Sequence, residues 1–437
     1  MAQKSILLTL LKKITAKMTG IPVAIFFALI LGSIVGSISW LFLFLVQWSY
    51  DVFWQQLPHS LIHFFNSNYG ISEGVVNLSY PAAVCTIGGL VIGLLEFKWG
   101  KRVVKFEQAL GEIKQTGTYR YHKLYQVLIL ALIPLVFGGV IGPEAGLSCV
   151  IAGMAVWIAD HFRNLKSKYA KINANICEMS IIAVLGSIFG APLFGFIAPF
   201  DNGKQSDLLK RQKVVIYLTV TFSAFTSFAI LTKKIGGLEG LPRFETIDWQ
   251  SGDLLWSIPA IALGVIFGIF YSLADNLSNI ISRKFAEHAI ILPIISGLIL
   301  GILGGLLPLS LFSGEAQMTD LINNYKTLGA IALFLIALAK VILCPLLYNT
   351  GWRGGNIFPV IFSGVAIGYA FSLLTGMPTV LAVTVCTASI TGYIMRKPLM
   401  VILLLLLCFP IDNLVFVAFA AVIASLVPEL PHKSVNK

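Results

Sequence analysis

The sequence predicts an all-α polytopic membrane protein. Of its 437 residues, 57% are hydrophobic and only 12% are charged, and the mean hydropathy is +0.86. Soluble globular domains do not have this composition. Apolar segments of about 20 residues, the length that crosses a bilayer as a helix, recur along most of the chain. A helix satisfies its backbone polar groups within one segment, which the hydrocarbon core of a lipid bilayer requires.

The charge pattern supports membrane insertion and not nucleic-acid binding. The net charge is +11, but the basic residues gather in short loops at 98–105, 163–171 and 204–213. Basic loops of this kind lie on the cytoplasmic side of membrane proteins. The six cysteines form no CxxC pair, and the six histidines form no His-Glu-x-x-His or Cys/His motif of the kind that binds zinc. We therefore expect no disulfide, metal or cofactor.

The first hundred residues predict the orientation of the chain. Residues 1–19 form an expected amphipathic helix on the cytoplasmic surface, with leucines on one face and lysines mostly on the other. Lys and Arg are then absent until Lys98. We expect a first span at about 20–49, an external loop at 51–77 and a returning span at about 78–96.

The rest of the chain predicts two membrane halves. Residues 233–253 mix charges of both signs and are expected to form an external hinge between halves at 20–232 and 253–428, with a short tail at 429–437. Several apolar segments are short or interrupted by Gly and Pro, namely 146–159, 180–200, 289–313 and 356–376. Interrupted helices near the midplane are typical of transporters built from inverted repeats.

Glu144 is the strongest candidate for a functional residue. No other charged residue occurs from 125 to 159. An unpaired carboxylate in hydrocarbon costs at least about 3 kcal/mol, so such a residue faces a protein interior or a wet cavity. Gly142 and Pro143 interrupt the preceding helix, and Pro143 suits the first position of a new one. The free N–H groups and positive dipole end of that helix would attract an anion.

Two roles for Glu144 follow from this setting. Its carboxylate could occupy the anion site itself and leave when it is protonated or displaced by a solute anion. Alternatively, it could cap a helix or pair within the bundle without a transport role.

A second Gly-rich break carries Arg353. No other charged residue occurs from 341 to 395. Glycines at 351, 354 and 355 allow the backbone to approach a ligand closely, and Phe358-Pro359 opens another apolar helix. We expect the 354–359 backbone to take part in function. Arg353 itself could be functional, or could extend to the membrane interface from a helix end.

At these residues the chain resembles the CLC family of chloride channels and anion/proton exchangers, from about residue 21 to 427. Residues 142–146 (GPEAG) resemble the family's Gly-Lys/Arg-Glu-Gly-Pro motif, which carries the gating glutamate. Residues 355–359 (GNIFP) resemble its Gly-x-Phe-x-Pro motif, with Phe one place later. Residues 190–195 resemble its Asn-Ala-Pro-Leu-Ala-Gly motif. The order and spacing of the three motifs make the resemblance specific.

The resemblance implies a homodimer with one pore per subunit. We expect it in a bacterial plasma membrane, with the N-terminus in the cytoplasm as the positive-inside pattern predicts. The resemblance also implies that Glu144 gates a central anion site. The residues expected to surround the anion, mostly through backbone N–H groups, are Gly142, Pro143, Ala145, Gly146, Gly355, Asn356, Ile357 and Phe358.

The chain also departs from the family pattern. Where the family has Gly-Ser-Gly-Ile-Pro, residues 100–104 read GKRVV, so Lys101 replaces the hydroxyl that would touch the anion. Lys101 could concentrate anions at the inner mouth, or it could be an ordinary cytoplasmic lysine. Asn202 stands at the counted position of the exchangers' inner proton glutamate. Asp201 is the adjacent substitute, and without one a channel or weakly coupled transporter is favoured. We also expect neither the family's last helix, with its anion-contacting tyrosine, nor regulatory domains.

Three classes of function are compatible with a polytopic membrane protein of this kind. The first is transport of a small inorganic anion, with chloride as the first candidate, by a channel or a proton-coupled exchanger. The second is another inverted-repeat secondary transporter for fluoride, nitrate or a small organic anion. The third is an intramembrane enzyme, which we do not expect because the sequence has no Gly-x-Ser-x-Gly element, His-Glu-x-x-His motif or intramembrane Asp pair. Sequence alone does not separate channel from exchanger, because a small difference in gating energy does so.

Overall fold

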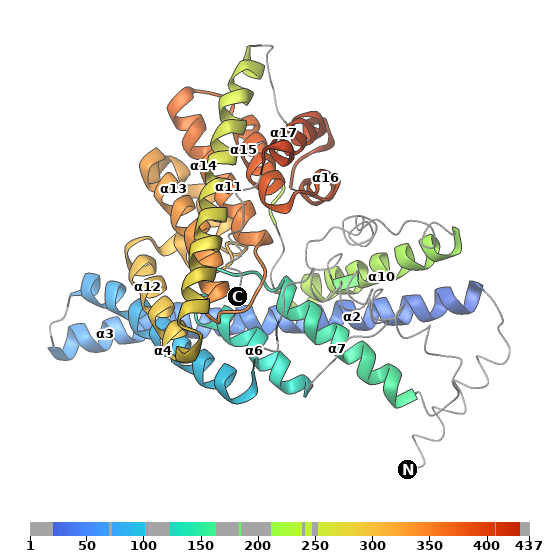
Figure 1. The fold of residues 1–437 in the computed structure, drawn as a ribbon, viewed down its shortest axis with the longest axis horizontal. Coiled ribbons are helices and arrows are strands. Elements are labelled where there is room, and N and C mark those ends of the chain that lie inside the picture. The colour runs from blue at the N-terminus through green and yellow to red at the C-terminus, as the bar shows by residue number, and fades with distance from the viewer. Residues whose placement is uncertain are drawn as a thin grey trace.

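The computed structural model describes residues 21–69, 72–100, 103, 123–162, 183–184, 211–237, 241–246, 252–406 and 408–428. Regular structure in these ranges is helical, apart from one isolated bridge between Gly142 and Gly355. The all-α prediction is therefore confirmed (Figure 1). The predicted surface helix at 1–19, the tail at 429–437, and residues Lys101, Asp201 and Asn202 lie outside the described ranges.

Six helices in these ranges are long and apolar enough to cross a membrane. They are Ile25–Asn68, Glu73–Trp99, Val214–Ile235, Leu255–Lys284, Met318–Asn349 and Ile357–Thr375.

Residues 51–77 were predicted to form an external loop, but most of this range is helical. Helix α2 (Ile21–Tyr50) continues through a π-helical turn, η1 (Asp51–Gln56), into α3 (Leu57–Tyr69), and α4 (Glu73–Trp99) starts soon after. No glycine interrupts residues 37–69, and the helical chain continues through Pro58 directly after the π-helical turn. The uninterrupted stretch of 44 residues is about 66 Å long at 1.5 Å per residue. It therefore extends beyond a hydrocarbon core of about 30 Å.

Two helices of the first half prepare the site. Helix α6 (Leu124–Val136) ends at Phe137, and Gly138 then adopts a positive φ of 83°. Helix α7 (Glu144–Phe162) follows after a short irregular segment. The break between the two helices contains Gly138, Gly139 and Gly142, and it places Glu144 in the first turn of α7.

The second half supplies a further set of helices, which are α11 (Asp253–Lys284), α12 (Ile291–Leu306), α13 (Met318–Asn349), α14 (Ile357–Thr375), α15 (Thr379–Met395), α16 (Pro398–Leu405) and α17 (Leu414–Leu426). Helix α14 packs between α13 and α15, and nearly all its residues are buried. Residues 356–376, expected to be short or interrupted, form the continuous 19-residue α14 with Gly364 and Gly368 inside it. They instead let α15 approach, because a Cβ on Gly368 would lie 2.4 Å from the Val383 Cα.

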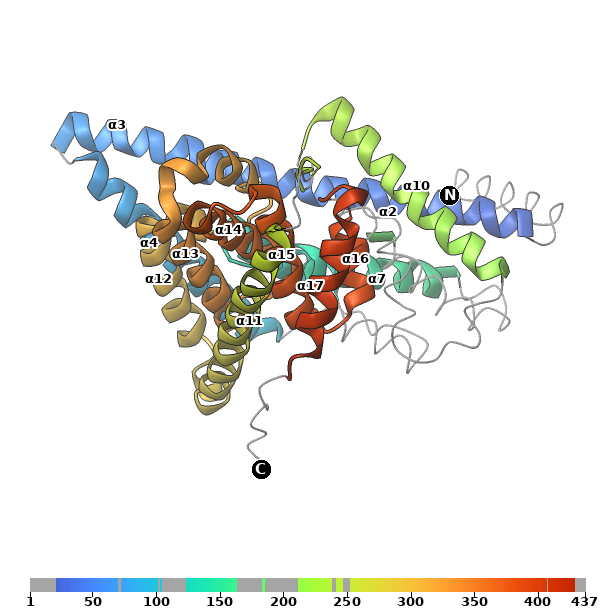
Figure 2. The ribbon, with the colours of Figure 1, turned by 90° about the horizontal axis from the view of Figure 1, so that it is seen from above.

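Close helix contacts also join distant parts of the sequence. Helix α10 (Arg211–Ile235) packs along α2 (Figure 2), and α12 packs along α4. At the second contact, a Cβ on Gly301 would lie 2.4 Å from the carbonyl oxygen of Pro81. Small residues four apart permit such close packing in membranes. The α4–α12 contact also connects elements assigned to the two predicted halves.

Candidate functional site

Two irregular segments cross at the centre of the candidate site. The first precedes α7 and the second precedes α14. They are joined by a reciprocal pair of backbone hydrogen bonds, in which Gly142 N–H donates to the Gly355 carbonyl and Gly355 N–H donates to the Gly142 carbonyl, both at 2.8 Å. The two motifs singled out in the sequence, separated by more than 200 residues, therefore meet in space.

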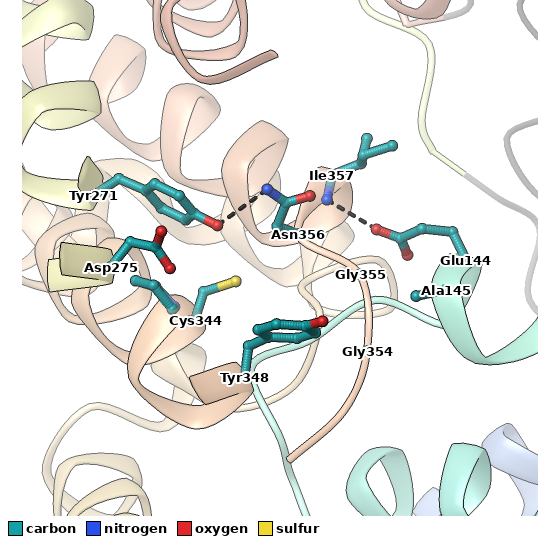
Figure 3. Close-up of a pocket in the computed structure, with 11 residues that line it drawn as sticks. Glu144, Ala145, Tyr271, Asp275, Cys344, Tyr348, Gly354, Gly355, Asn356 and Ile357 are labelled. Atoms are coloured by element: carbon teal, nitrogen blue, oxygen red, sulfur yellow. Dashed lines mark hydrogen bonds between the residues drawn. The ribbon is translucent and has the colours of Figure 1, made fainter. Parts of the chain in front are cut away.

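Glu144 points from the start of α7 to the start of α14. Its side chain is 1% exposed, and its Oε1 accepts a hydrogen bond of 2.9 Å from the backbone N–H of Ile357 (Figure 3). Ile357 is the first residue of α14, whose initial N–H groups have no acceptor within the helix. The carboxylate thus occupies the position where a helix N-terminus holds an anion.

Asn356 leaves this position open for Glu144. It is the N-cap residue of α14, where an Asn side chain ordinarily accepts a hydrogen bond from the first turn. Here it makes no such bond. Its amide Nδ2 instead donates to the Tyr271 hydroxyl at 3.0 Å. The end of α14 is therefore satisfied by a carboxylate from another helix and not by its own capping residue.

Gly142 and Gly355, in the crossing segments, have no room for a larger side chain. A Cβ on Gly355 would lie 1.9 Å from Glu144 Cδ, and one on Gly142 would lie 1.9 Å from Glu144 Oε2. The N–H groups of both glycines are engaged in the backbone bridge. In this conformation the N–H groups of Gly142 and Gly355 are not available to an anion. The Ile357 N–H, by contrast, donates to the Glu144 carboxylate as predicted for an anion-binding donor.

The remaining predicted residues surround this centre in different ways. Ala145, Gly355, Asn356 and Ile357 line one pocket with Glu144. Phe358 is buried, and Gly146 lies against Ala131 of α6.

Pro143 was expected as the first helical residue of α7, but the helix begins one residue later. The Pro143 carbonyl accepts the bond from Leu147 N–H at 2.9 Å. It therefore flanks the helix, at a boundary where a missing N–H is tolerated equally well.

Arg353 forms an ion pair that the sequence did not reveal. Its Nε lies 3.0 Å from Glu96 Oε1 near the end of α4, and the two side chains are 12% and 7% exposed. Its guanidinium also lies over the Tyr348 ring, 5.1 Å from the centroid. Arg353 is thus held inside the protein and does not extend to the interface. It fixes the segment leading to α14 against α4.

Two further buried charged residues were missed by the sequence reasoning. Lys340 of α13 is fully buried, and its Nζ donates to the carbonyls of Leu311 and Phe312 at 2.7 and 2.8 Å. Glu315 lies in the same 307–317 connection and is 5% exposed. Burial raises the pKa of the Glu315 carboxyl, and the charge of Glu144 raises it further. A second carboxyl group thus stands within electrostatic reach of Glu144.

The signal for both residues was present in the sequence. Glu315 is the first charged residue after 26 uncharged ones at 289–314, and Lys340 follows an uncharged stretch at 327–339. This is the criterion that singled out Glu144. Applied to every lone charge in an apolar segment, it would have found them.

Comparison with known proteins finds relatives over most of the chain. The sequence profile described as "Voltage gated chloride channel" matches residues 84–429. Proteins named provisionally as the ion-transport protein YfeO are 25% identical in Escherichia fergusonii and 27% in Escherichia coli strain 55989. These matches cover 78% and 79% of this chain and 77% of each relative.

Solved structures share the fold. The chain matches a CLC-type fluoride/proton antiporter with a TM-score of 0.66 and 21% identity, over 93% of this chain and 95% of the other. It matches a slow cyanobacterial Cl⁻/H⁺ antiporter with a TM-score of 0.69 and 16% identity, over 91% and 94%. With the family profile spanning most of its length, this multi-pass membrane protein belongs to the voltage-gated chloride channel family, the CLC family.

Proposed function

We propose that this protein carries small inorganic anions across a membrane through a site gated by Glu144, with chloride as the first candidate ion. The observation that supports this most directly is the hydrogen bond from Ile357 N–H to the Glu144 carboxylate. A helix N-terminus that holds a carboxylate can hold a halide, because both are monovalent anions attracted by the same N–H groups and dipole.

The gating step follows from competition for this position. Ionised Glu144 occupies the end of α14 and excludes the transported anion. Protonation removes its charge and weakens the attraction to Ile357 N–H, so the side chain leaves and an anion enters. Anion flux should then rise as the external pH falls. The same proton, released on the other side, would couple anion movement to proton movement.

The proposal extends to assembly and class. Membership of the family supports a homodimer with one pathway per subunit in a bacterial plasma membrane, and the positive-inside pattern supports a cytoplasmic N-terminus. Family membership also supports a transporter and not an intramembrane enzyme. Crosslinking in native membranes should therefore capture dimers, and recovery of monomers alone would contradict the assembly proposal.

Ion flux from proteoliposomes tests the function and the choice of ion. Purified protein is reconstituted with chloride, fluoride or nitrate inside, and anion release is followed with an electrode while internal pH is recorded. We expect chloride release well above that of protein-free vesicles. Release of fluoride alone would replace chloride as the substrate, and release of none of the three would overturn the proposal.

A further inference from the structure

Asp275 is the second carboxylate that lines the Glu144 pocket. Like Glu144 it is a lone charge, since no other charged residue occurs from 254 to 282. It is half-buried on α11, and Figure 3 shows it beside Tyr271, across the pocket from Glu144. In a pathway built for anions, a fixed carboxylate repels the substrate and attracts protons, so its position requires an explanation.

A polar connection leads from Glu144 towards Asp275. Ile357 N–H holds Glu144, and the neighbouring Asn356 side chain donates to the Tyr271 hydroxyl at 3.0 Å. Asp275 lies four residues after Tyr271, hence on the same face of α11. A tyrosine hydroxyl can both accept and donate a proton. Tyr271 is therefore suitably placed between the two carboxyl groups.

Asp275 is held in place by α13. Asn349 Nδ2 donates to Asp275 Oδ1 at 2.9 Å and to Ser278 Oγ at 2.8 Å. Tyr348 and Cys344, which also line the pocket, are neutral side chains. Arg353 lies over the Tyr348 ring and is paired with Glu96. Glu315 is not among the lining residues, and it is a further carboxyl group within electrostatic reach of Glu144. Glu144 and Asp275 are thus the two carboxylates among the residues that line this pocket.

The position of Asp275 along α11 indicates on which side of Glu144 it lies in the membrane. It lies about two turns before the basic end of α11 at Arg283 and Lys284. The positive-inside pattern predicts that this end is cytoplasmic. Asp275 is thus expected on the inner side of Glu144. Exchangers of the family have their proton-transferring glutamate on this side, and the counted position of that glutamate is Asn202 in this chain.

We infer that Asp275 is the inner proton acceptor for Glu144, which makes the protein a proton-coupled exchanger. In this step the O–H bond of the protonated Glu144 carboxyl breaks, an O–H bond forms on Asp275, and the negative charge returns to Glu144. The Tyr271 hydroxyl, which also lines the pocket, carries the proton between them by accepting one proton and donating another. Asp275 then releases its proton to cytoplasmic water. The inference rests on the proposed anion transport.

Asp275→Asn tests the relay with little change of structure, because an Asn oxygen can still accept from Asn349 but cannot take up a proton. Anion release and proton movement are recorded together in proteoliposomes. We expect anion flux to persist and proton movement to fall by about a hundredfold, the low end of what a positioned acid–base group contributes. Asp275→Glu should restore proton movement. Asp320→Asn, at an exposed carboxylate of α13, should match the wild type.

The outcomes separate the two claims. Absence of anion flux in the wild type overturns the proposed function. Anion flux without proton movement in the wild type, or an unchanged proton-to-anion ratio in Asp275→Asn, overturns the relay alone. Loss of proton movement in Asp201→Asn but not in Asp275→Asn would assign the relay to Asp201. If Asp275→Asn does not fold, Tyr271→Phe is the deciding variant. The relay predicts that it moves protons more slowly while anion flux is retained. An unchanged proton-to-anion ratio in Tyr271→Phe would contradict the relay.

Discussion

At the residue scale, the site depends on one carboxylate held where a transported anion would bind. Glu144 is 1% exposed, and a buried charge is tolerated only with compensating partners. The N-terminus of α14 provides such a partner, the Ile357 N–H. Gly142 and Gly355 leave the space that the Glu144 side chain occupies. This arrangement explains why an acidic side chain can stand at the centre of an anion pathway, and it predicts which neighbours cannot change.

Gly355→Ala tests the need for space beside Glu144. The new methyl group would lie 1.9 Å from Glu144 Cδ, so the carboxylate must move and the volume available to an anion shrinks. Overpacking costs about 1–3 kcal/mol, which corresponds to an anion affinity lower by roughly five- to a hundredfold. Anion binding by calorimetry and flux measure this change. Gly74→Ala, where a Cβ meets nothing within 4 Å, is the control, and equal affinity in both variants would contradict the account.

The Arg353–Glu96 pair yields a second residue-scale prediction. Arg353→Gln leaves the buried Glu96 carboxylate without its cation, which should lower the free energy of unfolding by about 3 kcal/mol. The double variant with Glu96→Gln should lose less than the sum of the single variants, because a Gln–Gln pair can still form a hydrogen bond. Thermal unfolding in detergent measures both. Arg283→Gln, at an exposed arginine, should change little, and strict additivity would exclude the pair as a source of stability.

At the element scale, glycines four residues apart set how closely the helices pack. Gly297, Gly301 and Gly305 of α12 face α4, and Gly89 of α4 faces the Pro293 carbonyl in return. Because lipid chains are as apolar as leucine, close van der Waals contact between helices replaces the hydrophobic effect as the driving force. These contacts fix α12, and through it the 307–317 connection that carries Glu315.

Gly301→Val tests this packing. Its side chain would meet the Pro81 carbonyl, 2.4 Å from the Cβ position, and backbone cannot move aside as a side chain can. We expect destabilisation of at least about 1–3 kcal/mol, seen as a lower unfolding midpoint. Ile302→Val is the matched control on the lipid-facing side of α12, where Ile302 is 45% exposed. Similar midpoints for the two variants would show that the α4–α12 contact is loose.

The sequence predicted the elements better than their ends. Spans near 20–49 and 78–96 were found because apolar runs of this length are a strong signal. The helical 51–69 segment was missed because low positive charge and aromatic residues indicate a side of the membrane and not a backbone conformation. The close approach of α15 to Gly364 and Gly368 was not predicted, because it is a tertiary contact that one sequence does not display.

At the scale of the whole molecule, the site is built from segments far apart in the chain. The motifs at 142–146 and 355–359 were identified from sequence, but their reciprocal backbone bridge was not. The pairing of Arg353 with Glu96, the contact of Asn356 with Tyr271, and the presence of Asp275 in the pocket depend on how the helices are arranged. Lone charges can be counted in a sequence, whereas their partners require the fold.

The predicted orientation can be tested on the whole protein. Ser67 of α3 and Lys284 of α11 are both exposed, and the positive-inside pattern places them on opposite sides of the membrane. In intact cells, a membrane-impermeant maleimide should label Ser67→Cys but not Lys284→Cys, which should react only after permeabilisation. The parent protein, whose described cysteines are all buried, is the labelling control. The reverse pattern would place the N-terminus outside and would reverse the direction of the proton relay.

Anion flux of Glu144→Gln as a function of external pH tests the central claim most directly. Glutamine has the shape of the protonated carboxyl but carries no charge that competes for the end of α14. In the wild type, flux should rise as external pH falls. In Glu144→Gln it should equal or exceed the wild-type value at neutral pH, lose its dependence on external pH, and proceed without proton movement. A variant that transports anions with the wild-type pH dependence would show that Glu144 is not the gate.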